Sequence, residues 1–468
     1  MIPFFPRQIS RLLTVTYLMV LILVSVIFMD YSMKIGYMVL GICFVCGFGF
    51  LTQIWSHDWK DSDSSRYVRS LFVAAVVLRL VWVVGSYFYY ISVTGIPFEL
   101  DVADAIGYHR EAEWLAGEPW STTWHYYFNE NTQSISDVGY PLYLITLYKI
   151  FGPVVIIPRI IKAFLSAWTC LLVYRVSART FGEPVGRIAG IMCALMPNLI
   201  IYCGYHLKET EMMFITVAAI ERADCLIKSP KMDIGNLLLT TLLAGCLFYM
   251  RNFLGIAVVL SIFCAVILTV AHTMEQGSRR VVIIIWASLC LLASSGGAVM
   301  NEIQENWEKR QSNVVNKRQE QVNAGIRWAK YATGTVMAPM AVALPFSTMV
   351  SVDNQVAQQT KHGGNYIRNF MAFFALFGIY EAFRSKKWRD YSLIGAYVVS
   401  YLAAVSMSGF SNSERFLLPA LPGLIMMWAY GVSQLRDKTY RLVIPWCVIV
   451  ALMEVGWAFF KLGSRGLL

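Results

Sequence analysis

Two carboxylates and a tyrosine hydroxyl lie close together in the polar run 98–117. Asp101, Asp104 and Tyr108 are spaced three and four positions apart, so a helix over residues 101–116 would place them on one face. A carboxylate that is partly shielded from water and can reach a hydroxyl or amine proton is suited to be a general base. The structural alternative is that Asp101 caps the helix and Asp104 is an ordinary exposed carboxylate.

Three basic residues, Lys208, Arg251 and Arg415, fall on the same predicted side of the membrane as these carboxylates. They would stabilise negative charge that develops there. The planar guanidinium of arginine can donate two parallel hydrogen bonds to an oxyanion, so we expect the two arginines to bind an anionic group ahead of the lysine. The structural alternatives are snorkelling for Lys208 and ion pairs of Arg251 with Glu209 and of Arg415 with Glu414.

Other polar residues near this predicted side could contact a substrate, namely Tyr108, His109, Asp137, Arg159, His206 and Glu209. Glu209 could orient a cation or, with Asp104 and the two histidines, hold a divalent metal. The spacing is not that of a metal motif, so no metal site or certain cofactor is predicted, and a divalent cation is kept as the alternative. Asp137 could equally cap a turn, and Lys162, close to Arg159 at the end of an apolar stretch, is expected to snorkel.

The composition indicates that membrane-spanning helices hold these residues. Of 468 residues, 57% are hydrophobic and 15% are charged, whereas a soluble domain carries roughly 25% charged residues. The mean hydropathy is +0.54. About thirteen stretches approach the ~20 apolar residues that cross a bilayer. They are 11–29, 34–54, 70–93, 155–176, 185–203, 209–228, 235–250, 253–271, 281–299, 365–383, 391–409, 416–434 and 442–461. The predicted fold class is an all-α integral membrane protein with short interfacial helices in two outer loops.

The placement of Lys and Arg between these stretches predicts the orientation. Counting the stretches as crossings brings every basic cluster to one side, from Arg7 and Arg11 to the cluster at 436–441. The N-terminus is then cytoplasmic, and 94–139 and 300–364 lie outside the cell (inner) membrane. The apolar stretch 331–352, interrupted by two prolines, would move later clusters outside if it crossed, so it is predicted to be re-entrant or interfacial.

Several classes of function and structure are disfavoured. The net charge of +10 is distributed among the orienting clusters, and base-reading motifs are absent, so nucleic acid is not an expected partner. The ten cysteines lie in or beside apolar stretches, which argues against a disulfide framework. Cys43 and Cys46 are expected to pack as small apolar side chains. The first helix is not followed by a small-residue cleavage site, so no removable signal peptide is expected.

The run 98–117 resembles the first extracytoplasmic loop of the GT-C glycosyltransferases, through Asp104-Ala-x-x-Tyr108-His109 and the following Leu-Ala-Gly. This superfamily includes the protein O-mannosyltransferases and the lipid A aminoarabinose transferases. Similar runs follow in the family's order at 139–143, 151–153, 174–182 and 194–197, so the resemblance covers roughly residues 70–255. It implies a polyprenyl-phosphate-linked sugar as donor and Asp104 as general base, with Asp101 as its rival or partner.

The resemblance also implies a division of the chain. Residues 1–69 would add two helices to a catalytic core at 70–299, followed by the outer loop 300–364 and C-terminal helices at 365–468. The implied function is inverting transfer of a sugar to a glycan, lipid or protein acceptor at the extracytoplasmic face. One alternative is an O-antigen polymerase or ligase, which would use basic outer loops and no catalytic carboxylate. Another is a transporter or flippase for lipid-linked glycans, with ionisable residues in mid-membrane.

Overall fold

The computed structural model describes residues 2–100, 103–130, 135–229, 233–269, 274–295, 340–352, 355–407, 413–463 and 465–467, with three single residues between 304 and 312. Within these ranges the secondary structure is helical, and extended backbone pairs only at one isolated bridge, between Ser32 and Val350. The predicted polar helix at the start of 300–364 lies outside the described residues, as does Asp101.

The helices of the first half of the chain are α1 (Arg7–Ile27), α2 (Ile35–Cys46), α3 (Thr52–Asp58), α4 (Ser64–Thr94), α5 (Ala103–Gly117), α6 (Trp120–His125), α7 (Gly139–Phe151), α8 (Ile156–Phe181), α9 (Glu183–Leu195), α10 (Pro197–Ile201) and α11 (Glu209–Lys228). Short 3-10 or π segments are η1 (Met29–Tyr31), η2 (Gly47–Leu51), η3 (Tyr126–Glu130), η4 (Ile135–Asp137) and η5 (Tyr202–Gly204).

The second half contributes α12 (Ile234–Met250), α13 (Asn252–Leu268), α14 (Met274–Ser295), α17 (Val356–Gln359), α18 (His362–Arg384), α19 (Ser392–Met407), α20 (Glu414–Leu417), η8 (Leu418–Ala420), α21 (Leu421–Ser433) and α22 (Asp437–Gly463). Each of the thirteen stretches predicted to cross the membrane overlaps one of these helices or a consecutive run of them. Six described helices are long and apolar enough to cross a membrane, or seven if the bent pair α9 and α10–η5 is one span. The chain is therefore a multi-pass membrane protein, and the count of thirteen crossings remains a prediction.

The bend between α9 and α10 is encoded locally. Pro197 begins α10, and Met196 before it adopts an extended backbone with φ −67° and ψ 115°, since a residue that precedes proline is disfavoured in the α region. The two helical pieces meet at 52°. This bend brings the loop 205–208 and the start of α11 against α8, where several of the predicted site residues lie.

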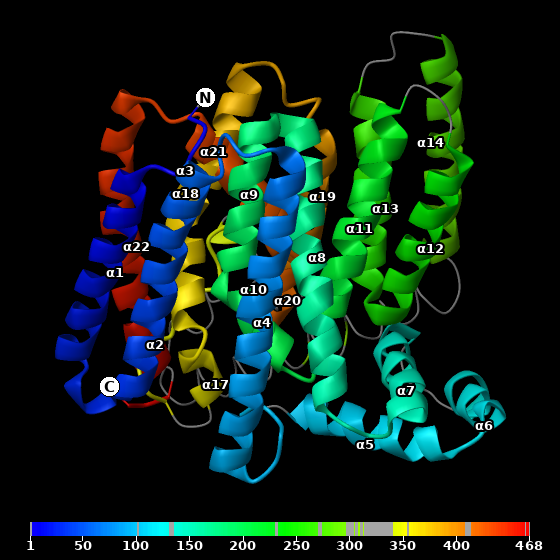
Figure 1. Cartoon of the computed structure of the whole chain (residues 1–468), viewed down its shortest axis with the longest axis horizontal. Helices are drawn as coiled ribbons and strands as arrows, with labels where there is room; N and C mark the ends of the chain where they lie inside the picture. Colours follow the sequence, from blue (N-terminus) through cyan, green and yellow to red (C-terminus); the bar gives the residue numbers. More distant parts are fainter. Residues whose placement is uncertain are drawn as a thin grey trace.

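Figure 1 shows the long helices side by side, with α5 lying across their ends and α7 beside it. The C-terminus lies at the same end as α5, and the N-terminus lies at the opposite end. This arrangement agrees with an odd number of crossings. The assignment of the α5 end to the outside of the cell remains a prediction from the basic clusters.

A buried arginine joins three helices of the bundle, α4, α8 and α9. Arg79 of α4 is fully buried. Its guanidinium donates to Ser166 Oγ of α8 at 2.7 Å and to the carbonyl oxygens of Cys193 and Ala194 at the end of α9, at 3.2 and 3.1 Å. A buried charge is tolerated only when its donors are used in this way. Arg79 therefore holds α4, α8 and α9 in fixed relation.

The described part of the predicted re-entrant segment, 340–352, has one short helical turn and then irregular and extended backbone. Its residues are largely buried. The carboxylate of Glu454 in α22 accepts hydrogen bonds from the Ser347 backbone nitrogen, at 3.0 and 3.2 Å, and from its hydroxyl, at 3.0 Å. This buried acid replaces the partners that a regular helix would supply to the backbone. The remainder, 331–339, lies outside the described residues.

Candidate active site

Helix α5 forms as the sequence predicted, and Asp104 lies in its first turn. Negative charge is favoured there because the first backbone N–H groups are unpaired. Helix α5 packs on α7, and its buried residues are Ala105, Ala112 and Leu115. Tyr108, one turn after Asp104, is largely covered, and burial raises the pKa of its hydroxyl, with the carboxylate of Asp137 adding to this effect.

Four ionised side chains from four parts of the chain form a connected network, here called the arginine cluster: Asp104, Glu209, Arg251 and Arg415. The Arg415 guanidinium donates to the carboxylates of both Asp104 and Glu209. Arg251, in the turn between α12 and α13, donates to the same Glu209 oxygen at 3.4 Å and to the Tyr401 hydroxyl at 3.3 Å. The predicted alternative of an Arg251–Glu209 pair is thus confirmed.

Exposure differs along the arginine cluster. Asp104 is 56% exposed and Arg415 20% exposed, whereas Glu209 is fully buried. Both arginines use Glu209 Oε1, and Glu209 Oε2 has no hydrogen-bond partner among the described residues. The buried acid therefore accepts from both arginines through one oxygen, and the exposed part of the network is Asp104 with part of Arg415.

The alternative pairing of Arg415 with its neighbour Glu414 is wrong. Glu414 instead accepts from Lys361 at 3.1 Å and from the amide of Asn198. Neighbouring residues at the start of α20 point to different sides, because a helix turns about 100° per residue. Lys361 and Asn198 were not identified from the sequence, since nothing in their local spacing connects them with Glu414.

Lys208 does not snorkel to solvent. Its side chain is 5% exposed and its ammonium donates to Asp137 Oδ1 at 2.6 Å and to the carbonyl oxygens of Ser136 and Met250 at 3.1 and 2.8 Å. Burial lowers the pKa of this lysine. The predicted residues Lys208 and Asp137 are therefore brought together, and they tie η4 to the ends of α11 and α12.

A second group of polar residues, here called the buried cluster, consists of Glu99, His109, Tyr148, Arg159 and His206. Arg159 donates to Glu99 at 3.2 Å with both side chains fully buried. The backbone nitrogen of His206 also donates to the Glu99 carboxylate, at 3.0 and 3.1 Å. Tyr148 bridges the two histidines, at 2.8 Å from His109 Nδ1 and 3.3 Å from His206 Nε2.

Burial lowers the pKa of both histidines, that of His206 well below its usual range. His206, beside the cationic side chains of Lys162 and Arg159, is therefore neutral at pH 7. His109, Arg159 and His206 were predicted from the sequence as site residues, whereas Glu99 and Tyr148 were not. Arg159 lies in a membrane-spanning helix, where an arginine requires a partner. This requirement was the one sign in the sequence that an acid such as Glu99 lies beside it.

The expected snorkelling of Lys162 is also wrong. Lys162 is fully buried and donates to the Tyr140 hydroxyl at 3.0 Å and to the carbonyl oxygens of Tyr205, at 2.9 Å, and Leu207. These carbonyl groups have no helical N–H partner, because the chain leaves helical geometry after η5. The lysine supplies the missing donors and fixes the loop that precedes Glu209.

In the part of the chain that the structure describes, no group of three or more His, Cys, Asp or Glu side chains could hold a metal ion. Asp104 and Glu209, the carboxylates considered for a divalent cation, both face arginine guanidinium groups. Their charge is already compensated, so these residues do not fit a resident metal.

The sequence matches no family model and no curated protein. Among solved structures, ArnT from Cupriavidus metallidurans bound to undecaprenyl phosphate has a TM-score of 0.50 and 13% identity, over 84% of this chain and 64% of that one. The oligosaccharyltransferase of Archaeoglobus fulgidus in the apo form has a TM-score of 0.50 and 13% identity, over 86% of this chain and 55% of that one. The chain thus spans less than two thirds of either protein. It shares the fold of these two proteins, which are members of the GT-C superfamily that the sequence resembles.

Proposed function

We propose that this chain, which has the GT-C fold, is a glycosyltransferase that moves a sugar from a polyprenyl phosphate carrier to an acceptor at the extracytoplasmic face of the cell membrane. The observation that carries the proposal is the arginine cluster. Asp104 and two guanidinium groups meet at the end of the helix bundle that bears α5. A general base beside positive charge for a phosphate is the chemistry that this transfer requires.

In the proposed reaction, Asp104 accepts the proton of an acceptor hydroxyl or amine. The electron pair of that group forms a bond to the anomeric carbon as the bond from this carbon to the phosphate oxygen breaks. The polyprenyl phosphate leaves with the electron pair of that bond, and its added negative charge is stabilised by Arg415 and Arg251. Attack from the face opposite the leaving group inverts the configuration of the sugar. Proton acceptance and stabilisation of the leaving phosphate are both performed by side chains of the protein itself.

The ion pair between Asp104 and Arg415 gives this scheme an order of events. A donor phosphate that accepts from Arg415 competes directly with Asp104, because both need the same guanidinium donors. Donor binding would therefore release Asp104 for proton transfer. Glu209 keeps Arg415 and Arg251 in place during this exchange and is a positioning residue.

The remaining predicted substrate contacts divide by their surroundings. Tyr108 lies one turn from Asp104, so its hydroxyl is proposed to contact the donor sugar. Asp137 is 50% exposed even though it pairs with Lys208, and it is proposed to accept from a sugar hydroxyl. Arg159 and His206 are fully buried and are proposed to support the loop that carries Glu209.

The test is sugar-dependent release of polyprenyl phosphate by the purified protein, incubated with a panel of polyprenyl-phosphate sugars. We expect Asp104→Asn to lower turnover by roughly 10²–10⁴-fold, the contribution typical of a general base. Glu113→Gln is the matched control, because Glu113 lies on the same helix and is exposed to a similar extent, 53% against 56% for Asp104. Wild-type turnover by Asp104→Asn would contradict the proposal and favour a polymerase. Carrier flux in liposomes without any glycan product would favour a flippase.

A further inference from the structure

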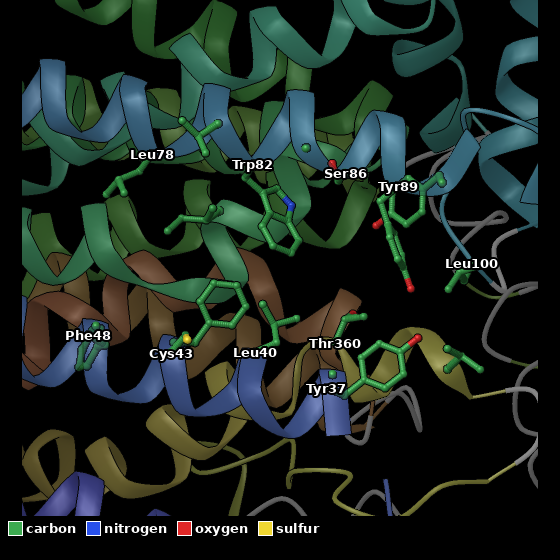
Figure 2. Close-up of a pocket in the computed structure, with 18 of the residues that line it drawn as sticks. Tyr37, Leu40, Cys43, Phe48, Leu78, Trp82, Ser86, Tyr89, Leu100 and Thr360 are labelled. Atoms are coloured by element: carbon green, nitrogen blue, oxygen red, sulfur yellow. The ribbon is translucent and has the colours of Figure 1, made fainter. Parts of the chain in front are cut away.

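A large apolar groove runs along the membrane-spanning part of the molecule between α2 and α4 (Figure 2). Its volume is about 1010 Å³. The walls include Leu40, Phe44 and Phe48 from the α2 side and Leu78 and Trp82 from α4, and Leu195 and Ile200 contribute from α9 and α10. Since α2 packs on α1 and α18 while α4 packs on α8 and η5, the two helices leave this space between them.

Glycines open the groove on both sides. Gly36 and Gly47 on the α2 side and Gly85 on α4 all line it, and a Cβ atom added at any of the three would meet no atom within 4 Å. Along α4, the lining extends from Leu78 to Val93, which is about 22 Å of helix. The groove therefore has the length and the lining of a site for an extended hydrocarbon chain.

One end of the groove is polar and faces the end of the bundle that carries α5. Lys34, Tyr37, Tyr89 and Thr360 line it there, and Figure 2 shows Tyr37, Tyr89 and Thr360 gathered near Leu100. The opposite end, near Phe48 and Leu78, has no such group among its labelled side chains. A ligand with one polar head and one apolar chain matches this gradient.

The polar end is also adjacent to the candidate active site. Leu100, which lines the groove, is four residues before Asp104, so their Cα atoms are at most ~14 Å apart. Thr360, which also lines it, precedes Lys361. Lys361 pairs with Glu414 at 3.1 Å, and Glu414 precedes Arg415. Two separate segments therefore lead from the head end of the groove to residues of the arginine cluster.

We infer that the acceptor of the proposed transferase is an amphiphile, whose apolar chain lies in the groove between α2 and α4 and whose polar head reaches Asp104. This inference rests on the proposed function. The arginine cluster has an order, from Asp104 through Arg415 and Glu209 to Arg251. Leu100 at the head end of the groove is four residues before Asp104, which needs the acceptor proton, while Arg251 lies at the far end of the cluster, between α12 and α13, and is proposed to bind the carrier phosphate. Donor and acceptor thus approach the sugar from different sides.

The test uses a hexadecyl glucoside that carries a photoreactive diazirine at the end of its alkyl chain, with the full-length protein in lipid nanodiscs. Peptide mapping by mass spectrometry locates the labelled residues. We expect labels on α2 and α4 along the groove. Gly85→Leu should reduce this labelling by roughly tenfold, equivalent to about 1.4 kcal/mol. Gly456→Leu is the matched control, since Gly456 lies in α22, also has open space where a Cβ atom would be added, and does not line the groove.

Three outcomes would overturn the inference. Labelling that avoids α2 and α4 would show that the groove does not take the chain. Loss of labelling in the presence of undecaprenyl phosphate would assign the groove to the donor. Equal competition by phosphatidylcholine would make it a site for bulk membrane lipid. Labelling does not require turnover, so it can fail while polyprenyl phosphate release succeeds, and the reverse.

Discussion

The arginine cluster and the buried cluster each contain an ion pair between an acid and an arginine at the same end of the helix bundle, yet their surroundings differ. In the buried cluster, Glu99 and Arg159 are fully buried, and the Glu99 carboxylate also accepts from a backbone nitrogen. In the arginine cluster, Asp104 is more than half exposed. Both clusters keep buried polar atoms without a partner among the described residues, Glu209 Oε2 in one and Arg159 Nε and Nη1 in the other. The comparison teaches that charge alone does not mark a site. A fully buried ion pair supports the fold, whereas a partly exposed one can exchange its partner for a ligand.

The largest effect that distinguishes the two clusters is expected on stability. Glu99→Ala would leave the Arg159 charge buried without its partner, which costs about 3–5 kcal/mol. Thermal unfolding in detergent would measure this loss. Asp104→Asn removes a mostly exposed charge and should change stability by less than about 1 kcal/mol. A Glu99→Ala protein as stable as the wild type would break the comparison.

The next effect is expected on turnover. Arg415→Gln removes the guanidinium shared by Asp104 and Glu209, and we expect polyprenyl phosphate release to fall by roughly 10²–10³-fold, as when one donor to a developing anion is lost. Arg389→Gln is a suitable control, because Arg389 lies beyond α18 and is not part of either cluster. Unchanged turnover in Arg415→Gln would remove the arginine cluster from the reaction.

A smaller effect is expected from the residue that orients Arg251. Tyr401→Phe deletes the hydroxyl that accepts from Arg251 at 3.3 Å but leaves the ion pair with Glu209. A hydrogen bond to a charged group contributes about 1.5–3 kcal/mol, so KM for the donor should rise by roughly tenfold with kcat little changed. A fall in kcat at constant KM would contradict a role in holding the donor phosphate.

A further effect is expected from pH and concerns the buried cluster. Burial lowers the pKa of His109 and His206, so the unfolded chain binds more protons than the folded one below the ordinary histidine pKa of about 6.5. Stability is then complete above about pH 6.5 and decreases as the pH falls, by at most about 1.4 kcal/mol per pH unit for each histidine. Melting temperatures from pH 7.5 to 5 would measure this, and His206→Asn should flatten the slope. An equal slope in that variant would assign the effect to other groups.

Much of the fold could be predicted because it depends on local pattern. Each apolar stretch coincides with helices, and the spacing from Asp104 to Tyr108 predicted α5. Counting crossings placed Asp104, Arg251 and Arg415 on one side, and the structure brings them together through Glu209. The individual pairings were less accessible. Lys162 and Lys208 are buried rather than snorkelling, because carbonyl groups freed at helix ends lie within reach of their ammonium groups.

The sequence by itself determined which segments are helical, which segments are apolar enough to lie in lipid, and which polar residues share one end of the molecule. These properties follow from hydrophobicity and helical period over short windows. Only the tertiary structure decided that Glu414 pairs with Lys361 while Arg415 pairs with Asp104, that Glu99 secures Arg159, and that α2 and α4 diverge around a groove. The physical reason is that these contacts join residues distant in the chain, and their geometry is set by packing between helices, which no local pattern records.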